Sequence, residues 1–130
     1  MRIQPGQVVC LLNASHEAAA LLRQECPEGV GLSEGLAEGP CNAIIFWPTG
    51  LEGLSDVFAQ LQRRIVPDGA IWVVMPKKRF ARARDTGFTW SEMQAAALRT
   101  DLVDNKDVTL SKEEYATRFV IRKERRARYV

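Results

Sequence analysis

The residues best suited to binding chemistry are basic side chains that directly follow an apolar run. Ala70 to Met75 are apolar, and Pro76, Lys77, Lys78 and Arg79 come next. A lysine ammonium binds phosphate as a point charge, whereas an arginine guanidinium binds it through two hydrogen bonds. Lys77 and Lys78 are therefore candidate residues for binding a small molecule or an anion. The alternative is a solvated loop that keeps a hydrophobic strand soluble.

Polar residues also follow two other apolar runs. Asn13 and Ser15 come after Val8 to Leu12, and Pro48 ends the run from Ala43 to Trp47. Ser15 suits a helix N-cap, where it serves as a simple cap or as part of an anion site at the free N–H groups. Because ligands bind beyond the carboxyl ends of parallel strands, Asn13, Ser15 and Pro48 are predicted to line one cleft with Lys77 and Lys78.

The link after the first predicted strand argues against standard cofactor binding. Enzymes that bind dinucleotides or S-adenosylmethionine need glycines there, because the backbone must approach the cofactor closely. Residues 12–16 contain no glycine. We therefore predict no cofactor and assign no catalytic residue. His16 is the single histidine, so no histidine-rich metal site is expected.

Two further groups of residues are interpreted as structural. Cys10, Cys26 and Cys41 are odd in number and widely spaced, which argues against a disulfide framework and against zinc. Asp104 and Lys106 lie two apart on a predicted strand, so they share a face and can pair with Arg118 on the next strand. A polar cluster at a cleft or dimer surface is the alternative for these charged residues.

The elements that position these residues alternate between strands and helices. Helices are predicted to start at Ser15, Leu54 and Thr89, and the helix from Leu54 has an apolar face that extends to Ile65. Pro67-Asp68-Gly69 predicts a turn into the central strand. Strands are expected at residues 8–12, 29–33, 43–47, 70–75, 102–110 and 115–121, with the last two paired as an antiparallel hairpin.

The predicted fold class is α/β, with a three-layer, mostly parallel, Rossmann-like sheet and a C-terminal antiparallel hairpin. A wholly apolar strand such as 70–75 needs protein on both faces, which is typical of the centre of such a sheet. The chain of 130 residues is expected to form one domain over residues 1–122, followed by a frayed basic tail at 123–130. No apolar run is long enough to span a bilayer, so we expect a cytoplasmic protein without membrane contact.

The predicted order of elements resembles the later part of the Rossmann-like methyltransferases that use S-adenosylmethionine, over roughly residues 43–121. A closer resemblance is to a bacterial family of short proteins, domain of unknown function family 3052, which implies a Rossmann-like fold and no established activity. The residues that carry it are Pro5-Gly6, Leu12-Asn13-Ala14, Pro67, Gly69, Trp72, Pro76-Lys77-Lys78, Leu102-Val103-Asp104, Lys106, Tyr115 and Arg118-Phe119-Val120. Tyr115 departs from the tryptophan expected there.

The net charge of +2 conceals two basic segments, residues 77–84 and 122–128, on an acidic remainder. Phe80 lies within the first, so its loop resembles a surface for phosphate contact and base stacking. The last strand should run antiparallel to strand 70–75, which would place the two segments at opposite edges of the sheet.

Three functions follow, in order of preference. The first is a non-catalytic binding or regulatory domain, either a monomer or a homodimer, whose partner is a small molecule, an anion or a protein. The second is a small-molecule enzyme related to the S-adenosylmethionine-dependent methyltransferases. The third is a nucleic-acid-binding protein that uses the loop from Lys77 to Arg84.

Overall fold

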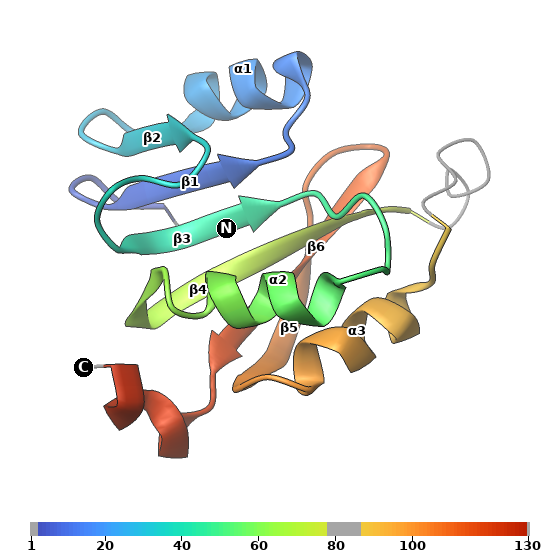
Figure 1. The fold of residues 1–130 in the computed structure, drawn as a ribbon. Coiled ribbons are helices and arrows are strands. Elements are labelled where there is room, and N and C mark those ends of the chain that lie inside the picture. Colours follow the sequence, from blue (N-terminus) through green and yellow to red (C-terminus); the bar gives the residue numbers. More distant parts are fainter. Residues whose placement is uncertain (1–2, 78–86, 130) are drawn as a thin grey trace.

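The computed structural model describes residues 3–77 and 87–129, and its elements alternate as expected (Figure 1). Lys78 and the basic residues up to Arg84 lie outside the described residues. The strands are β1 (Val8–Leu12), β2 (Gly31–Glu34), β3 (Cys41–Phe46), β4 (Ile65–Pro76), β5 (Leu102–Thr109) and β6 (Glu114–Ile121). The helices are α1 (His16–Glu25), α2 (Leu54–Leu61), α3 (Trp90–Leu98) and the 3-10 helix η2 (Lys123–Tyr129).

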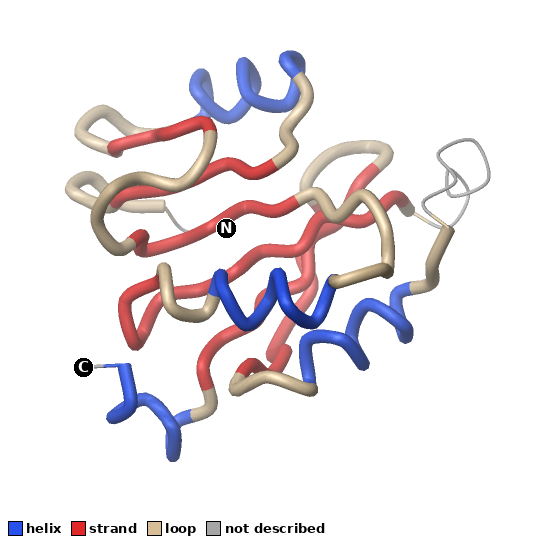
Figure 2. Tube along the Cα trace, viewed as in Figure 1, coloured by secondary structure: helices blue, strands red, loops and turns tan. Residues whose placement is uncertain are grey.

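The strands form one mixed sheet in the order β2-β1-β3-β4-β6-β5 (Figure 2). β2, β1, β3 and β4 pair in parallel, and β6 pairs antiparallel with both β4 and β5. The C-terminal hairpin therefore closes one side of a parallel sheet, which confirms the predicted fold class.

β4 is the central apolar strand. Residues Ala70 to Pro76 are all buried, with β3 on one side and β6 on the other. The predicted turn at Pro67-Asp68-Gly69 is wrong, because these residues belong to β4, where the register with β3 shifts. A Cβ at Gly69 would lie 2.7 Å from the carbonyl oxygen of Asn42, so the irregular stretch requires glycine.

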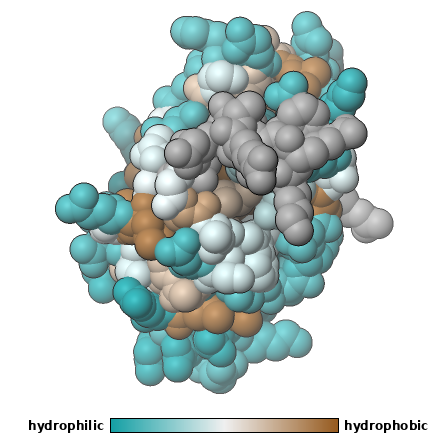
Figure 3. Space-filling model, turned by 90° about the vertical axis from the view of Figure 1, so that its right-hand side faces the viewer, coloured by the Kyte–Doolittle hydropathy of each residue, from teal (hydrophilic) through white to brown (hydrophobic). Residues whose placement is uncertain are grey.

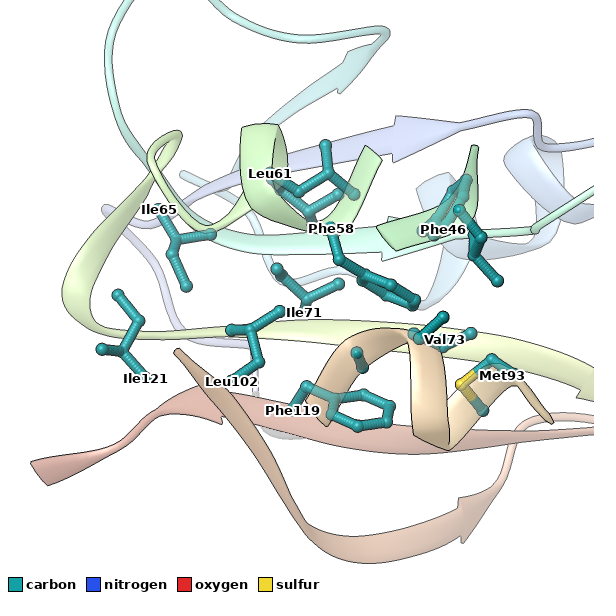
Figure 4. Close-up of a cluster of buried hydrophobic side chains, with 14 of the residues drawn as sticks. Phe46, Phe58, Leu61, Ile65, Ile71, Val73, Met93, Leu102, Phe119 and Ile121 are labelled. Atoms are coloured by element: carbon teal, nitrogen blue, oxygen red, sulfur yellow. The ribbon is translucent and has the colours of Figure 1, made fainter. Parts of the chain in front are cut away.

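Helices cover both faces of the sheet and give three layers. The buried side chains of α2 and α3 join one core, which includes Phe58, Ile71 and Phe119 (Figure 4). The buried side chains of α1 join a second core on the opposite face, which includes Ile45 and Trp72. Burial of apolar surface on both faces of the sheet is the main force that holds the layers together.

The helix predictions are confirmed in type and corrected in detail. A helix does start at Thr89, which forms a capping box with Glu92. In α1 the buried residues are Ala19 and Leu22, whereas Leu21 is 44% exposed. α2 ends at Leu61 because the chain turns into β4, so Ile65 continues the apolar pattern from a strand.

Cys10 and Cys41 form a disulfide, which corrects the expectation of unpaired structural cysteines. Both residues are fully buried, and their Cα atoms lie 6.6 Å apart. The sequence separation of 31 residues conceals the pairing, because only the adjacency of β1 and β3 brings the two side chains together.

The predicted cluster of Asp104, Lys106 and Arg118 does not form. The register of β5 against β6 shifts between Asp104 and Lys106, so the two side chains no longer share a face. Asp104 accepts a hydrogen bond of 3.0 Å from the amide of Gln94 in α3. Lys106 and Arg118 instead lie over the Trp72 ring on the other face, 5.6 and 5.9 Å from its centroid.

Residues 123–129 are folded, whereas the sequence predicted a frayed tail. They form η2, whose Tyr129 packs against the core shared by α2 and α3. Within the described part of the chain, no helix has the length and apolar character needed to cross a membrane.

Candidate functional site

The carboxyl ends of β1 and β3 are joined by the side chain of Asn13. The backbone N–H of Trp47 donates to the carbonyl oxygen of Leu12 at 3.0 Å, which continues the pairing of the two strands. Asn13 then adopts a left-handed backbone, with φ of 64°, and its amide Nδ2 donates to the Trp47 carbonyl oxygen at 3.1 Å. This amide bridge occupies the point at which the sheet order reverses, since β1 has β2 on one side and β3 on the other.

Ser15 caps α1 as predicted. Its hydroxyl oxygen accepts a hydrogen bond of 3.1 Å from the backbone N–H of Ala18. The cap satisfies one free N–H of the first turn and fixes where α1 leaves the sheet. One face of α1 is thereby directed over the end of β3.

A cleft of about 520 Å³ lies between α1, the end of β3 and the turn that joins β5 to β6. That volume falls in the range of sites for small organic ligands. Its walls combine an apolar surface with polar groups at the strand ends. The lining residues are Asn13, Ser15, Glu17, Ala18, Leu21, Leu22, Glu25, Trp47, Pro48, Thr49, Leu110, Ser111, Glu113 and Glu114.

The charged side chains among these lining residues are all glutamates. Glu17 and Glu25 come from α1, and Glu113 and Glu114 come from the β5–β6 turn. Ionised carboxylates accept hydrogen bonds and attract cations. The described walls therefore favour a ligand with hydroxyl, amine or sulfonium groups on an apolar body over a simple anion.

The structure brings three of the predicted site residues together and separates a fourth from them. Asn13, Ser15 and Pro48 all line the cleft, whereas Lys77 is not among its described lining residues. Lys77 follows β4, and its backbone N–H donates to the Glu113 carbonyl oxygen at 2.7 Å, next to the cleft. Lys78 lies outside the described residues.

The residues missed by the sequence prediction come from α1 and from the β5–β6 turn. Glu17 and Leu21 could have been predicted from the sequence, because they lie on the helix that Ser15 caps. Leu110 and Glu113 could not have been predicted from the sequence. They belong to the β5–β6 turn, which lies beside α1 only in the folded sheet.

A second cleft of about 430 Å³ adjoins the first and shares Leu22, Glu25 and Leu110 with it. Cys26 lines this second cleft. Burial raises the pKa of the Cys26 thiol, and the negative charge of the nearby Glu25 carboxylate raises it further. The thiol is therefore less reactive than a free cysteine, which agrees with a structural role.

Figure 3 views the molecule toward the edge at which β1 and β3 end. Apolar patches lie among hydrophilic residues on the part of this surface that is coloured. A ligand at this edge would thus meet both kinds of surface.

No family model and no curated protein matches this chain, so the resemblance to domain of unknown function family 3052 is not supported. Solved structures do match. An S-adenosylmethionine-dependent methyltransferase from Aquifex aeolicus has a TM-score of 0.66 at 13% identity, with 93% of this chain and 85% of that chain covered.

Two further structures agree. The N-methyltransferase NodS from Bradyrhizobium japonicum has a TM-score of 0.65 at 8% identity, with 92% of this chain and 88% of that chain covered. A TehB-like S-adenosylmethionine-dependent methyltransferase from Corynebacterium glutamicum has a TM-score of 0.62 at 11% identity, with 92% and 82% covered. At these identities the similarity shows the fold, and the chain has the Rossmann-like fold of these methyltransferases.

Proposed function

We propose that this protein is a non-catalytic relative of the methyltransferases that binds a small organic molecule in the cleft beside α1. The observation that carries the proposal is the cleft itself, which lies beyond the carboxyl ends of β1 and β3. Open α/β sheets bind their ligands at this location. Asn13, Ser15 and Pro48 are the proposed ligand-binding residues at its strand side.

The amide bridge of Asn13 supports a binding role without methyl transfer. The loop after the first strand of a methyltransferase carries glycines, so that the backbone can approach the cofactor. Here a left-handed asparagine fills that position and bonds to Trp47. These residues do not fit the usual close approach of the cofactor, and we derive no methyl-transfer step.

S-adenosylmethionine is nevertheless the first compound to test. The expectation of no cofactor finds no support in the comparisons, because the matching structures include S-adenosylmethionine-dependent enzymes. The compound also combines hydroxyl, ammonium and sulfonium groups, which suit the glutamates of the cleft. Its demethylated product, nucleotides and inorganic phosphate are tested beside it for comparison.

Thermal melting tests the proposal. A ligand at 100 times its dissociation constant stabilises a protein by about 2.7 kcal/mol, which raises Tm by several degrees. We expect at least one organic compound of this panel to raise Tm, and phosphate to leave it unchanged. A panel in which no compound raises Tm would contradict the proposal.

Two phenylalanine substitutions on α1 locate the site. Ala18→Phe fills the cleft, whereas Ala20 is exposed on the same helix and does not line it. We expect Ala18→Phe to abolish the ligand-dependent shift in Tm and Ala20→Phe to retain it. A shift that persists in Ala18→Phe would place the ligand elsewhere, and turnover of S-adenosylmethionine would contradict the non-catalytic role.

A further inference from the structure

A strongly basic surface lies at the edge of the sheet opposite the cleft. Three chain segments form it: residues 62–64 between α2 and β4, residues 99–101 between α3 and β5, and residues 122–129, which include η2. They contain eight basic and two acidic residues, a net charge of +6 against +2 for the whole chain. The basic residues of this amino-edge surface are Arg63, Arg64, Arg99, Arg122, Lys123, Arg125, Arg126 and Arg128.

The sheet topology brings the three segments together. β6 is antiparallel to both β4 and β5, so the end of β6 lies beside the starts of the other two strands. Asp101 joins the segments directly. Its backbone N–H donates to Gln62 Oε1 at 2.9 Å, and its carbonyl oxygen accepts from the Arg122 N–H at 2.9 Å. In Figure 1 the C-terminus lies on the left, away from the edge at which β1 and β3 end.

The Asp101 carboxylate holds η2 in place. It accepts a hydrogen bond of 2.5 Å from the Tyr129 hydroxyl and one of 2.9 Å from Arg125 Nη1. The hydrogen bond from Tyr129 contributes most to lowering the pKa of Asp101, and the bond from Arg125 lowers it further. The carboxylate is therefore charged at neutral pH. Arg126 Nε donates to the Ile121 carbonyl oxygen at 3.0 Å, which fixes a second arginine.

The surface remains cationic and accessible after these contacts. Two carboxylates, Asp101 and Glu124, cannot neutralise eight basic side chains, and the side chain of Arg128 is 70% exposed at 3.8 Å from Asp101. Arg63, Arg99 and Lys123 are also exposed. Because η2 is held by Asp101, its arginines lose less conformational entropy when they bind a partner.

We propose that the amino-edge basic surface binds the phosphate backbone of a nucleic acid. Seven of its eight basic residues are arginines, and guanidinium groups bind phosphate oxygens bidentately. The cations extend over three chain segments, which suits a chain of phosphates better than one small anion. Ala127 is the exposed apolar residue of η2, so this helix offers no large apolar side chain for insertion into a membrane.

This binding is independent of the proposed ligand cleft and of the loop at Lys77. Fluorescence anisotropy with a labelled 20-nucleotide DNA strand and its duplex, measured from 50 to 300 mM salt, tests it. The double variant Arg63→Glu, Lys123→Glu removes two exposed cations. The control Arg23→Glu, Lys112→Glu has the same change in net charge at exposed residues on α1 and the β5–β6 turn.

We expect the wild-type protein to bind with an affinity that falls steeply with salt. The Arg63, Lys123 variant should bind at least tenfold more weakly, and its slope of log affinity against log salt should be shallower by about 1.5 to 2. The control should stay within about threefold of wild type, because Arg23 and Lys112 lie outside the three segments of the basic surface and salt screens longer-range effects of exposed charges. Equal Tm values for both variants verify that each is folded.

Four outcomes would overturn the proposal. The first is no binding of either oligonucleotide at 50 mM salt, and the second is an equal loss of affinity in the variant and its control. The third is binding to vesicles of anionic phospholipid but not to DNA. If only Lys77→Glu, Lys78→Glu abolishes binding, the site is the loop and the amino-edge surface is excluded.

Discussion

Asn13 is the residue at which this chain departs most clearly from an open cofactor site. A non-glycine residue rarely adopts a positive φ, and asparagine is among those that tolerate it. At φ of 64° its side chain reaches the carbonyl oxygen of Trp47 and bridges β1 and β3. One residue therefore supplies both the turn and the bond that closes the strand ends.

Two substitutions at this position separate the bond from the backbone conformation. Asn13→Gly keeps the left-handed turn and loses the hydrogen bond, so we expect a loss of about 1 kcal/mol in the free energy of unfolding. Asn13→Ala also strains the backbone and should lose about 2 to 3 kcal/mol. Urea denaturation measures both. Equal losses would show that the left-handed turn does not constrain this position.

Among the elements, η2 shows how a polar segment becomes ordered. Its sequence has no apolar periodicity, and a frayed tail was predicted there because terminal residues are often poorly ordered. Tyr129 attaches η2 to the rest of the protein. Its ring packs against the core, and its hydroxyl donates a hydrogen bond to Asp101. Burial, together with the bond to Asp101, raises the pKa of Tyr129 to about 12.

This pKa predicts how the attachment of η2 depends on pH. Unfolded tyrosine has a pKa near 10, so the folded value is raised. The contribution of Tyr129 to stability is therefore complete below pH 10 and is lost between about pH 10 and 12 as the hydroxyl ionises. The difference in unfolding free energy between wild type and Tyr129→Phe, measured by urea denaturation at each pH, should shrink over that interval.

Tyr129→Phe is its own control, because the variant lacks the ionising hydroxyl and keeps the ring. A difference that remains constant up to pH 12 would contradict the bond between Tyr129 and Asp101. A difference that disappears already below pH 9 would contradict the raised pKa.

The whole molecule has two proposed binding surfaces at opposite edges of one sheet. The cleft lies at the carboxyl ends of the parallel strands β1 and β3, and the amino-edge basic surface lies at the starts of β4 and β5 and the end of β6. The sheet between them is continuous, and its inner strands β1, β3, β4 and β6 are mostly buried. The two surfaces share no contact among the described residues that line them.

Substitutions at the two edges should therefore have additive effects on stability. We expect Ala18→Phe and the pair Arg63→Glu, Lys123→Glu to combine within about 0.5 kcal/mol, as measured by urea denaturation of the single and combined variants. A coupling energy above about 1 kcal/mol would show that the edges communicate through the sheet.

The sequence by itself determined the order of elements, the fold class and part of the cleft. A wholly apolar strand such as Ala70 to Met75 indicates burial on both faces. A helix cap such as Ser15 is also recognisable from the local sequence. The absence of glycine after Leu12 was equally local. Each of these signals depends on residues that are neighbours in sequence.

Only the tertiary structure decided which distant residues meet. The disulfide of Cys10 with Cys41, the bulge that separates Asp104 from Lys106, the glutamates of the β5–β6 turn and the attachment of Tyr129 all depend on strand order and register. Strand register is set by the packing of the whole sheet, because a shift of one residue moves every side chain to the other face. The cleft and the amino-edge basic surface thus arise from contacts that no local pattern encodes.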